Sequence, residues 1–405
     1  MKLFNQDQFI AQYVTERSES LFTADLAKNQ AQLSKAIDAK SVLVIGGAGT
    51  IGSSFLKALL QFRPAKLYVV DLNENGLTEL VRDLRSSVGY HIPNDFKTYP
   101  IDFASPVFEK ILVQEGPFHI VANFAAHKHV RSEKDHYSIE AMIHNNVIKA
   151  KYLLDLLVMH PPEHFFCVST DKAANPVNVM GASKKLMEDV ILAYAKKITI
   201  TTARFANVAF SNGSLLAGFI ERMMKRQPLS SPTDVRRYFV SPEESGQICL
   251  LACVLGQSGQ VFFPKLREED MKTFSAIGVD FLQAYGNYTP DYCSTEQEAR
   301  EKARTLDETA TKYPVYFFAT DTSGEKKYEE FYVPGEDVDF DTFEQLGVIR
   351  NIPTKPLEQI DELFDRLEAL FESDQVSKQK VVELMAEFIP NFQHIETGKS
   401  LDQKM

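Results

Sequence analysis

The 405-residue chain has no run of about 18 consecutive apolar residues, which is the length a bilayer-spanning helix requires. Its first segment, 1–40, is polar and lacks the apolar core of a secretory signal peptide. These absences argue against a membrane partner. We therefore expect a soluble, cytoplasmic protein.

Basic residues are outnumbered by acidic ones. The chain has 44 Lys and Arg against 55 Asp and Glu, a formal net charge of -11. This balance argues against nucleic acid as a partner, because a polyanion is bound by clustered positive charge. An anionic substrate would have to be met by local cations.

Cysteine is scarce, and none of it has metal-binding spacing. The four cysteines are Cys167, Cys249, Cys253 and Cys293. Cys249 and Cys253 lie four residues apart in an apolar helical stretch, so we expect them in the core as reduced thiols. We predict no metal site.

Short apolar runs alternate with longer amphipathic ones over residues 41–206. This alternation predicts an α/β fold with a Rossmann-like, doubly wound parallel sheet. The expected strands are 41–46, 66–71, 96–102, 119–125, 165–170 and 198–205, and the expected helices are 51–62, 75–86, 139–159 and 181–197. Apolar residues at helical spacing make 1–40 an N-terminal helical extension.

The pattern loosens after residue 207. We expect 207–350 to form a smaller, discontinuous substrate-binding lobe, with a strand at 260–264 and a helix at 270–285. Strands 313–320 and 327–333 are expected to pair as a hairpin across 321–324. The segment 351–405 should end in two helices, 357–372 and 376–389. An apolar stripe on the first of them fits packing against the body or an oligomer contact.

A glycine-rich loop, Gly46-Gly-Ala-Gly-Thr-Ile-Gly52, follows the first strand and opens a helix. Gly46, Gly49 and Gly52 allow a tight turn and let the backbone approach a pyrophosphate, which the helix N-terminus then binds. Thr50 and Ile51 complete the loop. This context predicts a dinucleotide site.

Residues at the ends of three neighbouring strands extend that site. Asp71 can accept hydrogen bonds from ribose hydroxyls and would repel a 2′-phosphate, which favours NAD, although Lys66 and Arg82 leave NADP open. Asp102 is placed either to bind the adenine amino group or to cap a turn. Ala125 is small enough to let the chain pass beneath the cofactor.

Two short motifs carry the candidate chemistry. Ser169-Thr-Asp-Lys172 follows a buried strand at the carboxyl edge, where open α/β sheets bind ligands. Asp171 and Lys172 adjoin, so each can perturb the pKa of the other in a dry cleft. Met180 and Lys184 lie one helical turn apart and share a face.

These segments resemble the extended short-chain dehydrogenase/reductase superfamily, and most closely its polysaccharide-biosynthesis branch, the UDP-N-acetylglucosamine 4,6-dehydratases. The most specific match runs from Val168 to Lys184, and the resemblance covers about 41–265. Supporting matches are Ala125-Ala-His-Lys-His-Val130, Asn145-Asn-Val147, Ala203-Arg-Phe-Ala-Asn-Val208 and Arg237-Tyr-Phe239. The family's usual tyrosine, four residues before the lysine, is Met180 here. The chain is therefore similar to the tyrosine-deficient subgroup with Ser169, Met180 and Lys184.

The chain also departs from the family pattern at two places. Arg131-Ser-Glu-Lys134 replaces the usual Pro-Leu-Val-Glu, and Lys149-Ala150 replaces a Gly-Thr pair. The first departure lies beside the expected sugar contacts.

The resemblance implies a hydro-lyase that acts on UDP-N-acetylglucosamine or a related NDP-hexose for surface glycan biosynthesis. Oxidation at C4, loss of water across C5–C6 and return of hydride to C6 would give a 4-keto-6-deoxy sugar nucleotide and regenerate NAD. Asp171 would protonate O6, and Lys172 would take the C5 proton. Burial beside the oxidised nicotinamide would depress the pKa of Lys172. Because Met180 cannot move a proton, the O4 proton would go to Thr170, Ser169, a water or Lys184.

The resemblance also implies binding roles. Lys184 would hold the nicotinamide ribose, and Asn146 would lie at the cofactor. Lys128 and Asn207 are expected at the substrate, and Arg237, or the adjoining Arg236, at its pyrophosphate. Arg204 would either assist there or be structural.

Two other functions stay open. One is a sugar-nucleotide 4-epimerase or reductase of the same superfamily, against which Met180 argues. The other is a non-enzymatic dinucleotide-binding sensor or scaffold. A homo-oligomer is expected. The nucleotide, the sugar, the C5 stereochemistry and the downstream glycan are left undetermined by the sequence.

Overall fold

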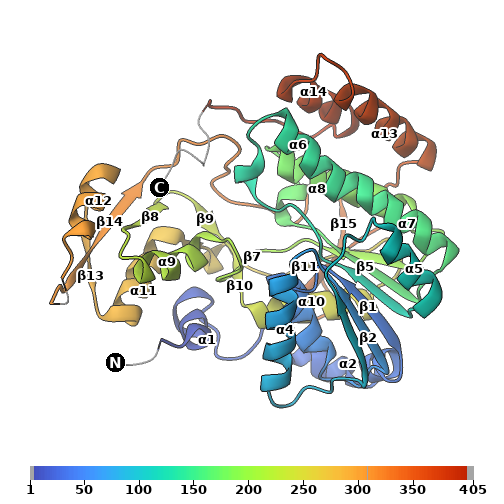
Figure 1. Cartoon of the computed structure of the whole chain (residues 1–405). Coiled ribbons are helices and arrows are strands. Elements are labelled where there is room, and N and C mark those ends of the chain that lie inside the picture. Colours follow the sequence, from blue (N-terminus) through green and yellow to red (C-terminus); the bar gives the residue numbers. More distant parts are fainter. Residues whose placement is uncertain (1–3, 308, 399–405) are drawn as a thin grey trace.

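A single large sheet organises most of the chain in the computed structural model, which describes residues 4–307 and 309–398 (Figure 1). The sheet has nine strands in the spatial order β15-β16-β11-β6-β5-β4-β1-β2-β3. Their bounds are β15 Asp337–Asp339, β16 Leu346–Arg350, β11 Val261–Pro264, β6 Ile200–Ala203, β5 His164–Val168, β4 Ile120–Asn123, β1 Ser41–Ile45, β2 Lys66–Val70 and β3 Asp95–Tyr99.

The strands from β11 to β3 are parallel, and β16 and β15 add an antiparallel edge. The chain runs outward from β1 to β3, returns to β4 on the other side of β1, and then continues to β6. The sheet therefore has a topological switch point between β1 and β4, where open α/β sheets bind ligands. The predicted doubly wound α/β class is confirmed.

Alternate residues of the central strands β1, β2, β4 and β5 enter two different cores, as the two-residue period of a strand requires. In β1, Val42 and Val44 face one core, and Leu43 and Ile45 face the other. The first core is covered by α2 Thr23–Ile37, α3 Thr50–Leu59, α4 Glu74–Ser86 and α10 Pro242–Leu255. The second is covered by α5 Pro106–Glu115, α6 His136–Ile143, α7 Lys149–Met159 and α8 Val179–Ala193.

The helix predicted over 139–159 is interrupted by one π-helical turn, η3 His144–Ile148, between α6 and α7. Single π-turns of this kind are frequent at functional sites. Short 3₁₀ turns, η2 Val130–Ser132, η4 Asp171–Ala173 and η5 Glu268–Asp270, lie in the connections.

A smaller lobe stands beside the sheet, on the left of Figure 1. It contains a parallel three-stranded sheet in the order β13-β14-β8 and a third apolar core. Its elements are β8 Leu229–Pro232, β13 Thr289–Tyr292, β14 Lys312–Phe318, α9 Leu215–Met224, α11 Phe274–Gly286 and α12 Glu296–Arg304. Two small ladders, β7 Asn207–Val208 with β10 Phe239–Val240 and β9 Arg236–Arg237 with β12 Lys272–Thr273, join the lobe to the body.

The predicted segment 207–350 is thus divided between two places. Its residues 242–264 and 337–350 complete the large sheet and its helical cover, whereas 215–232 and 274–318 build the lobe. The predicted hairpin is wrong, because 327–333 contains no strand and β14 pairs with β8 and β13 instead. The alternating pattern of β14 fixed a strand but could not identify its distant partners.

The N-terminal extension is helical, as predicted, and connects the lobe to the body. It consists of α1 Gln6–Phe9, the π-turn η1 Ile10–Val14 and α2. Phe9 packs against Phe210 and Phe281 of the lobe. Further along, Arg17 forms an ion pair of 2.8 Å with Glu244, the buried acid in the first turn of α10.

The two C-terminal helices, α13 Leu357–Phe371 and α14 Lys378–Phe388, lie over α6 and α8 (Figure 1). Ile360, Phe364 and Leu367 from the predicted apolar stripe are buried in the same core as α8. The stripe therefore packs within the chain, and the predicted homo-oligomer stays a prediction. The ends of the two predicted extensions, 1–3 and 399–405, lie outside the described residues.

Cys249 and Cys253 are buried on α10, which confirms the core packing predicted for them. Within the described residues, every helix is too short or too polar to cross a lipid bilayer.

Candidate active site

A cavity of about 320 Å³ opens above the carboxyl ends of β4, β5 and β6, near the switch point. Its volume lies at the lower end of the range usual for small-molecule sites. The cavity is lined by eight predicted residues, which are Ile51, Lys128, Ser169, Thr170, Lys172, Met180, Lys184 and Asn207. Apolar side chains, including Phe124, Phe205, Phe239 and Phe274, form much of the remaining wall.

The glycine loop brings three backbone segments close together at the start of α3. An added Cβ at Gly46 would collide with the backbone of Ala125, and one at Gly52 would collide with the carbonyl of Gly46. Gly49 is exposed and is the N-cap of α3, where no side chain caps the first amides. The loop thus presents free N–H groups and the positive end of a helix, which suit a diphosphate.

Polar contacts already engage several side chains of the predicted cofactor site. Asp71 accepts hydrogen bonds from the amides of Ala48, at 3.0 Å, and Asn73, at 2.9 Å. Thr50 Oγ1 accepts one from the amide of Asn212 in the lobe, at 2.9 Å. Asp71 is only partly buried, so its carboxylate can accept further bonds from a ribose.

Asp102 is paired with a residue at which the chain departs from the family pattern. Its carboxylate contacts the amine of Lys149 and accepts a bond of 2.9 Å from the amide of Ala104. Burial raises the pKa of Asp102, but the bonds from Lys149 and Ala104 outweigh it and lower the pKa overall. Asp102 is thus both a cap and half of an ion pair, and its adenine contact stays a prediction.

Asn146 holds a loop beside the cleft. Its side chain accepts from the amide of His127 at 2.8 Å and donates to the carbonyl of the same residue at 2.9 Å. It also donates to Ser183 of α8 at 3.0 Å. Asn146 is buried on the π-turn, so the structure assigns it a structural bond network and leaves its cofactor contact a prediction.

Thr170, Asp171 and Lys172 form a connected chain of hydrogen bonds. Thr170 Oγ1 and Lys172 Nζ each donate to Asp171 Oδ1 at 2.9 Å. Asp171 is buried, whereas Thr170 and Lys172 line the cavity. The hydroxyl and the amine that face the cavity are therefore joined by one buried carboxylate.

The surroundings of Lys172 differ from expectation. Burial lowers the pKa of Lys172, but Asp171 and Glu329, whose Oε1 lies 3.8 Å from Nζ, outweigh burial and raise it. The predicted depression of this pKa is therefore wrong for the chain's own groups. The sequence could not show Glu329 here, because it comes from 157 residues further along the chain and from no motif.

Lys184 lies in a contrasting environment. Its buried amine donates to the carbonyl of Val168 at 2.7 Å and contacts the sulfur of Met187 at 3.1 Å. Burial lowers the pKa of Lys184, against the weaker effects of Cys167 and Glu188. Met180 lines the cavity one turn before Lys184, in the place that the resemblance assigns to a tyrosine.

Ser169 is committed to a buried ionic network. Its hydroxyl donates to Glu188 at 2.6 Å, and Glu188 also accepts two bonds from Arg204, at 3.0 and 3.1 Å. Burial raises the pKa of Glu188, but Arg204 and Lys185 outweigh it, so the pKa lies below its usual value. Arg204 is itself fully buried, so its structural interpretation is confirmed.

The predicted substrate cations occupy two different places. Lys128 lies in the cavity wall, and its side chain is exposed to solvent. Partial burial of its amine lowers the pKa of Lys128. Arg237 is buried instead, and its guanidinium donates to the carbonyls of Lys326 and Lys327, at 2.9 and 3.3 Å. Arg237 is not part of the cavity lining, so its contact with a pyrophosphate stays a prediction. Arg236 is exposed.

His129 lines the cavity but was not predicted as a site residue, although it lies inside the Ala125–Val130 segment that resembles the family. Burial lowers its pKa, and nearby cations, Lys128 first among them, lower it further. Ser211, Gly213 and Ser214 also line the cavity. They lie in an irregular loop that no sequence pattern assigned to the site.

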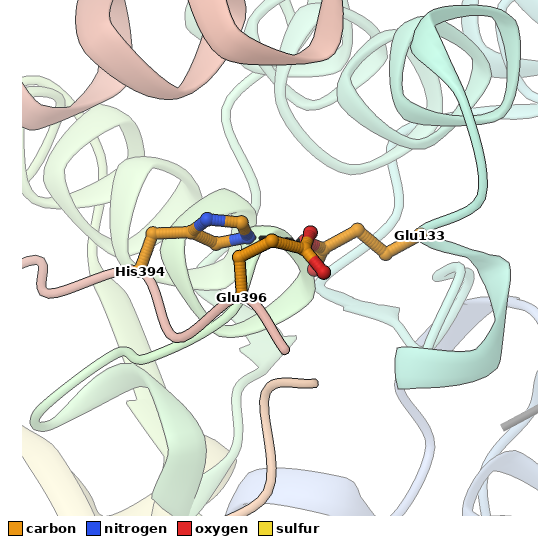
Figure 2. A group of neighbouring side chains, drawn as sticks. All are labelled: Glu133, His394 and Glu396. Atoms are coloured by element: carbon orange, nitrogen blue, oxygen red, sulfur yellow. Dashed lines mark hydrogen bonds and ion pairs between the residues drawn. The ribbon is translucent and has the colours of Figure 1, made fainter. Parts of the chain in front are cut away.

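A second polar cluster connects the C-terminal segment to the start of α8. Figure 2 shows Glu133, His394 and Glu396 converging, with their potential ligand atoms within 4.8 Å of one another. Lys378 lies 3.3 Å from the carboxylate of Glu133 and 2.6 Å from that of Glu396. Glu133 also accepts from the amide of Val179 at 2.7 Å. Lys378 is ion-paired with both carboxylates, and His394 contacts Glu133, so these bonds hold the C-terminal segment against the start of α8.

Comparisons with known proteins show which family the chain belongs to. A family model described as polysaccharide biosynthesis protein matches residues 42–279, more than half of the chain. A protein of Methanocaldococcus jannaschii named uncharacterized membrane protein MJ1061 is 28% identical over 316 residues, which cover 76% of this chain and 85% of that protein. A UDP-N-acetylglucosamine 4,6-dehydratase (inverting) of Campylobacter jejuni is 26% identical over 236 residues, which cover 56% of this chain and 67% of that one.

A UDP-glucose 4-epimerase of Rickettsia canadensis is 33% identical over 135 residues, 32% of this chain and 39% of the epimerase. Among solved structures, Pen from Bacillus thuringiensis superposes with a TM-score of 0.61 and 20% identity, covering 82% of this chain and 98% of that one. That likeness concerns the fold. The family match includes the glycine loop, the Ser169–Lys172 segment and Lys184, and the chain therefore belongs to the polysaccharide biosynthesis protein family.

Proposed function

We propose that this chain is a nucleotide-sugar 4,6-dehydratase that uses NAD and acts on UDP-N-acetylglucosamine or a related NDP-hexose in surface glycan biosynthesis. The observation that carries the proposal is the bonded chain Thr170–Asp171–Lys172 at the same cavity as Lys184. A simple alcohol dehydrogenase has no use for a buried carboxylate that joins a hydroxyl to an amine. Loss of water needs an acid at the leaving oxygen and a base at the adjacent carbon.

The residues of the glycine loop fit a dinucleotide. Free amides at the start of α3 suit its diphosphate, and Asp71 at the end of β2 suits an unphosphorylated ribose. A bound NAD would supply the hydride acceptor and donor, and the chain's own groups supply the proton transfers. Lys184, at the cavity wall, would bind the ribose nearest the reacting carbon.

Thr170 is our choice for the O4 proton. Its hydroxyl lines the cavity and already donates to Asp171, so it can accept the O4 proton while passing its own to the carboxylate. Ser169 is less suited, because its hydroxyl donates to Glu188, whose pKa is lowered by Arg204 and Lys185 despite burial. The transfer through Thr170 leaves Asp171 protonated, which is the state an acid at O6 requires.

The elimination then uses both neighbours. Asp171 gives its proton to O6 as the C6–O6 bond breaks, and Lys172 takes the C5 proton in its neutral form. Asp171 carries the proton that came from O4, and Lys172, 2.9 Å away, enters this step as the neutral amine. The two side chains then hold one proton between them, and the O4 proton leaves in the water that is formed. The C5 proton is returned from Lys172 when C6 is reduced.

Substrate binding is proposed to use the lobe side of the cavity. Lys128 is the cation in the wall, and Asn207 offers an amide beside it. Arg237 could reach a diphosphate only after release from the carbonyls of Lys326 and Lys327. We therefore place Lys128 first among the three predicted substrate residues.

A substrate carrying deuterium at C4 tests the proposal. The full-length protein is incubated with NAD and C4-deuterated UDP-N-acetylglucosamine, and the product is examined by proton and deuterium NMR. A dehydratase moves the deuterium to C6 of a 4-keto-6-deoxy sugar. An epimerase returns the deuterium to C4 and leaves the hydroxyl at C6, and this result would contradict the proposal. GDP-N-acetylglucosamine and dTDP-glucose are tested in the same way. If none of the three sugar nucleotides reacts, the proposal is also contradicted.

A further inference from the structure

Glu329 lies deep beside the catalytic pair although it comes from an irregular segment. The stretch 319–336 contains no helix or strand, yet the Glu329 side chain is only 4% exposed. Its neighbour Glu330 has a side chain that is 42% exposed. The chain thus buries one of two adjacent, chemically identical side chains at this position.

The buried carboxylate is surrounded by cations but is poorly bonded. Lys172 and Arg237 each lie 3.8 Å from Glu329 Oε1, and Lys326 lies 4.0 Å from Oε2. Within the described residues, Oε2 accepts no hydrogen bond. A carboxylate is costly to bury when its oxygens are unsatisfied, so packing alone does not account for it.

The position of Glu329 explains where the Lys172 amine lies. Asp171 takes one N–H of Lys172 at 2.9 Å, and Glu329 attracts the same ammonium from 3.8 Å. Of the other charged groups near Lys172, Arg237 opposes this attraction and is itself held by the carbonyls of Lys326 and Lys327. The charged set is therefore two carboxylates, Lys172 at the cavity, Arg237 behind it and Lys326 on the far oxygen of Glu329.

We propose that Glu329 is a positioning residue for Lys172, a second carboxylate that holds the amine at the cavity and controls when it releases its proton. The proposal rests on the function assigned above only in naming that proton's use. Burial raises the pKa of Glu329 itself, and the cations Lys172, Arg237 and Lys326 act against that rise. In its charged form Glu329 favours the ammonium form of Lys172, which makes Lys172 a stronger base and keeps it protonated to higher pH. Loss of Glu329 would give an amine that is free of its proton at lower pH but less able to take one from carbon.

The first test measures the amine directly. Wild type, Glu329→Gln and the control Glu330→Gln are labelled with acetic anhydride across a pH series, and the Lys172 peptide is quantified by mass spectrometry. We expect the midpoint of Lys172 labelling to move to lower pH in Glu329→Gln and to stay in place in Glu330→Gln. Coincident midpoints in all three proteins would overturn the inference.

The second test follows turnover. In Glu329→Gln we expect kcat to fall about tenfold with little change in KM, and the limb of the kcat profile that reports the base to move to lower pH. A purely structural role would lower stability or raise KM without moving that limb. If Glu329→Gln does not fold, Glu329→Asp replaces it. The shorter side chain places its carboxylate further from the Lys172 amine, so the labelling midpoint of Lys172 and the base limb of the kcat profile should move in the same direction, but by less. Unmoved midpoints in Glu329→Asp would also overturn the inference.

The two tests separate this inference from the proposed function. A protein that converts no sugar nucleotide but shows the labelling shift would contradict the dehydratase assignment and keep the role of Glu329 toward Lys172. A protein that forms the 4-keto-6-deoxy product but shows neither shift would support the dehydratase assignment and contradict the role of Glu329 toward Lys172.

Discussion

Two lysines face one cavity from opposite electrostatic surroundings. Around Lys172, burial lowers the pKa, but the carboxylates of Asp171 and Glu329 outweigh it and the pKa rises. Around Lys184, burial lowers the pKa and the nearest polar partner is the neutral carbonyl of Val168, at 2.7 Å. The same side chain is thus given two different proton affinities within one site.

This difference separates two tasks. A lysine paired with carboxylates can exchange a proton with them, which suits a group that takes a proton from carbon and gives it back. A lysine held by a carbonyl and apolar neighbours has no proton partner of that kind, and its fixed position suits binding. The contrast predicts that substitutions on the Lys172 side change turnover, and that those on the Lys184 side change cofactor affinity.

The largest effect is expected from Asp171→Asn. This change removes the acid at O6 and the carboxylate that joins Thr170 to Lys172. We expect kcat to fall by about 10²–10⁴-fold with cofactor affinity unchanged, measured by product NMR and calorimetric titration with NAD. Asp374→Asn, at an exposed position, is the matched control and should keep full activity. Wild-type turnover in Asp171→Asn would remove Asp171 from the mechanism.

The next effect is expected from Lys184→Met, which keeps the length of the side chain and removes its charge. A hydrogen bond that involves a charged group contributes about 1.5–3 kcal/mol, so NAD affinity should weaken about 10- to 100-fold in calorimetric titration. The control Lys196→Met alters an exposed lysine just after the same helix. If Lys184→Met left NAD affinity intact while abolishing turnover, both lysines would belong to the chemistry and the contrast between them would fail.

The sequence predicted the residues that lie next to regular elements better than those that lie in irregular segments. The glycine loop, Asp71 and the Thr170–Lys184 segment lie next to regular strands and helices, where local patterns fix both the element and the edge it presents. The strands predicted in 41–206 accordingly appear in the sheet, and the predicted helices cover it, with changes of a few residues at their ends and one π-turn inside the helix predicted over 139–159. Helix α5 was not predicted. Eight of the predicted site residues line one cavity.

The remainder depends on contacts between distant segments, which no local pattern records. Glu329 reaches Lys172 from an irregular stretch, and β14 chooses β8 and β13 over the hairpin expected for it. Lys149 departs from the family pattern in the sequence, but its pairing with Asp102 could be seen only in the structure. The sequence therefore predicted several of the groups that line the cavity, while the structure showed which charges surround them.

A smaller effect is expected at the far end of the cofactor. Asp71→Asn removes a charge that would repel a 2′-phosphate, and its single amide oxygen can keep one of the two bonds that the carboxylate oxygens accept from the amides of Ala48 and Asn73. One charge interaction near the surface is worth about 1 kcal/mol or more, so the ratio of NADP to NAD affinity should rise about five- to tenfold. Titration of both cofactors measures it. An unchanged ratio would mean that Asp71 does not face the ribose.

The smallest effect concerns the order in which the two amines lose their protons. In the wild type, acetic anhydride labelling across pH should give Lys184 a lower midpoint than Lys172, because the pKa of Lys184 is lowered and that of Lys172 is raised. In Asp171→Asn, burial and Arg237 act on Lys172 against Glu329 alone, so its midpoint should fall toward that of Lys184, which does not move. Mass spectrometry of the two peptides reads both midpoints in one sample. If the midpoint of Lys172 does not fall in Asp171→Asn, Glu329 rather than Asp171 is the carboxylate that dominates this amine, and the acid and base pair proposed for Asp171 and Lys172 loses its support.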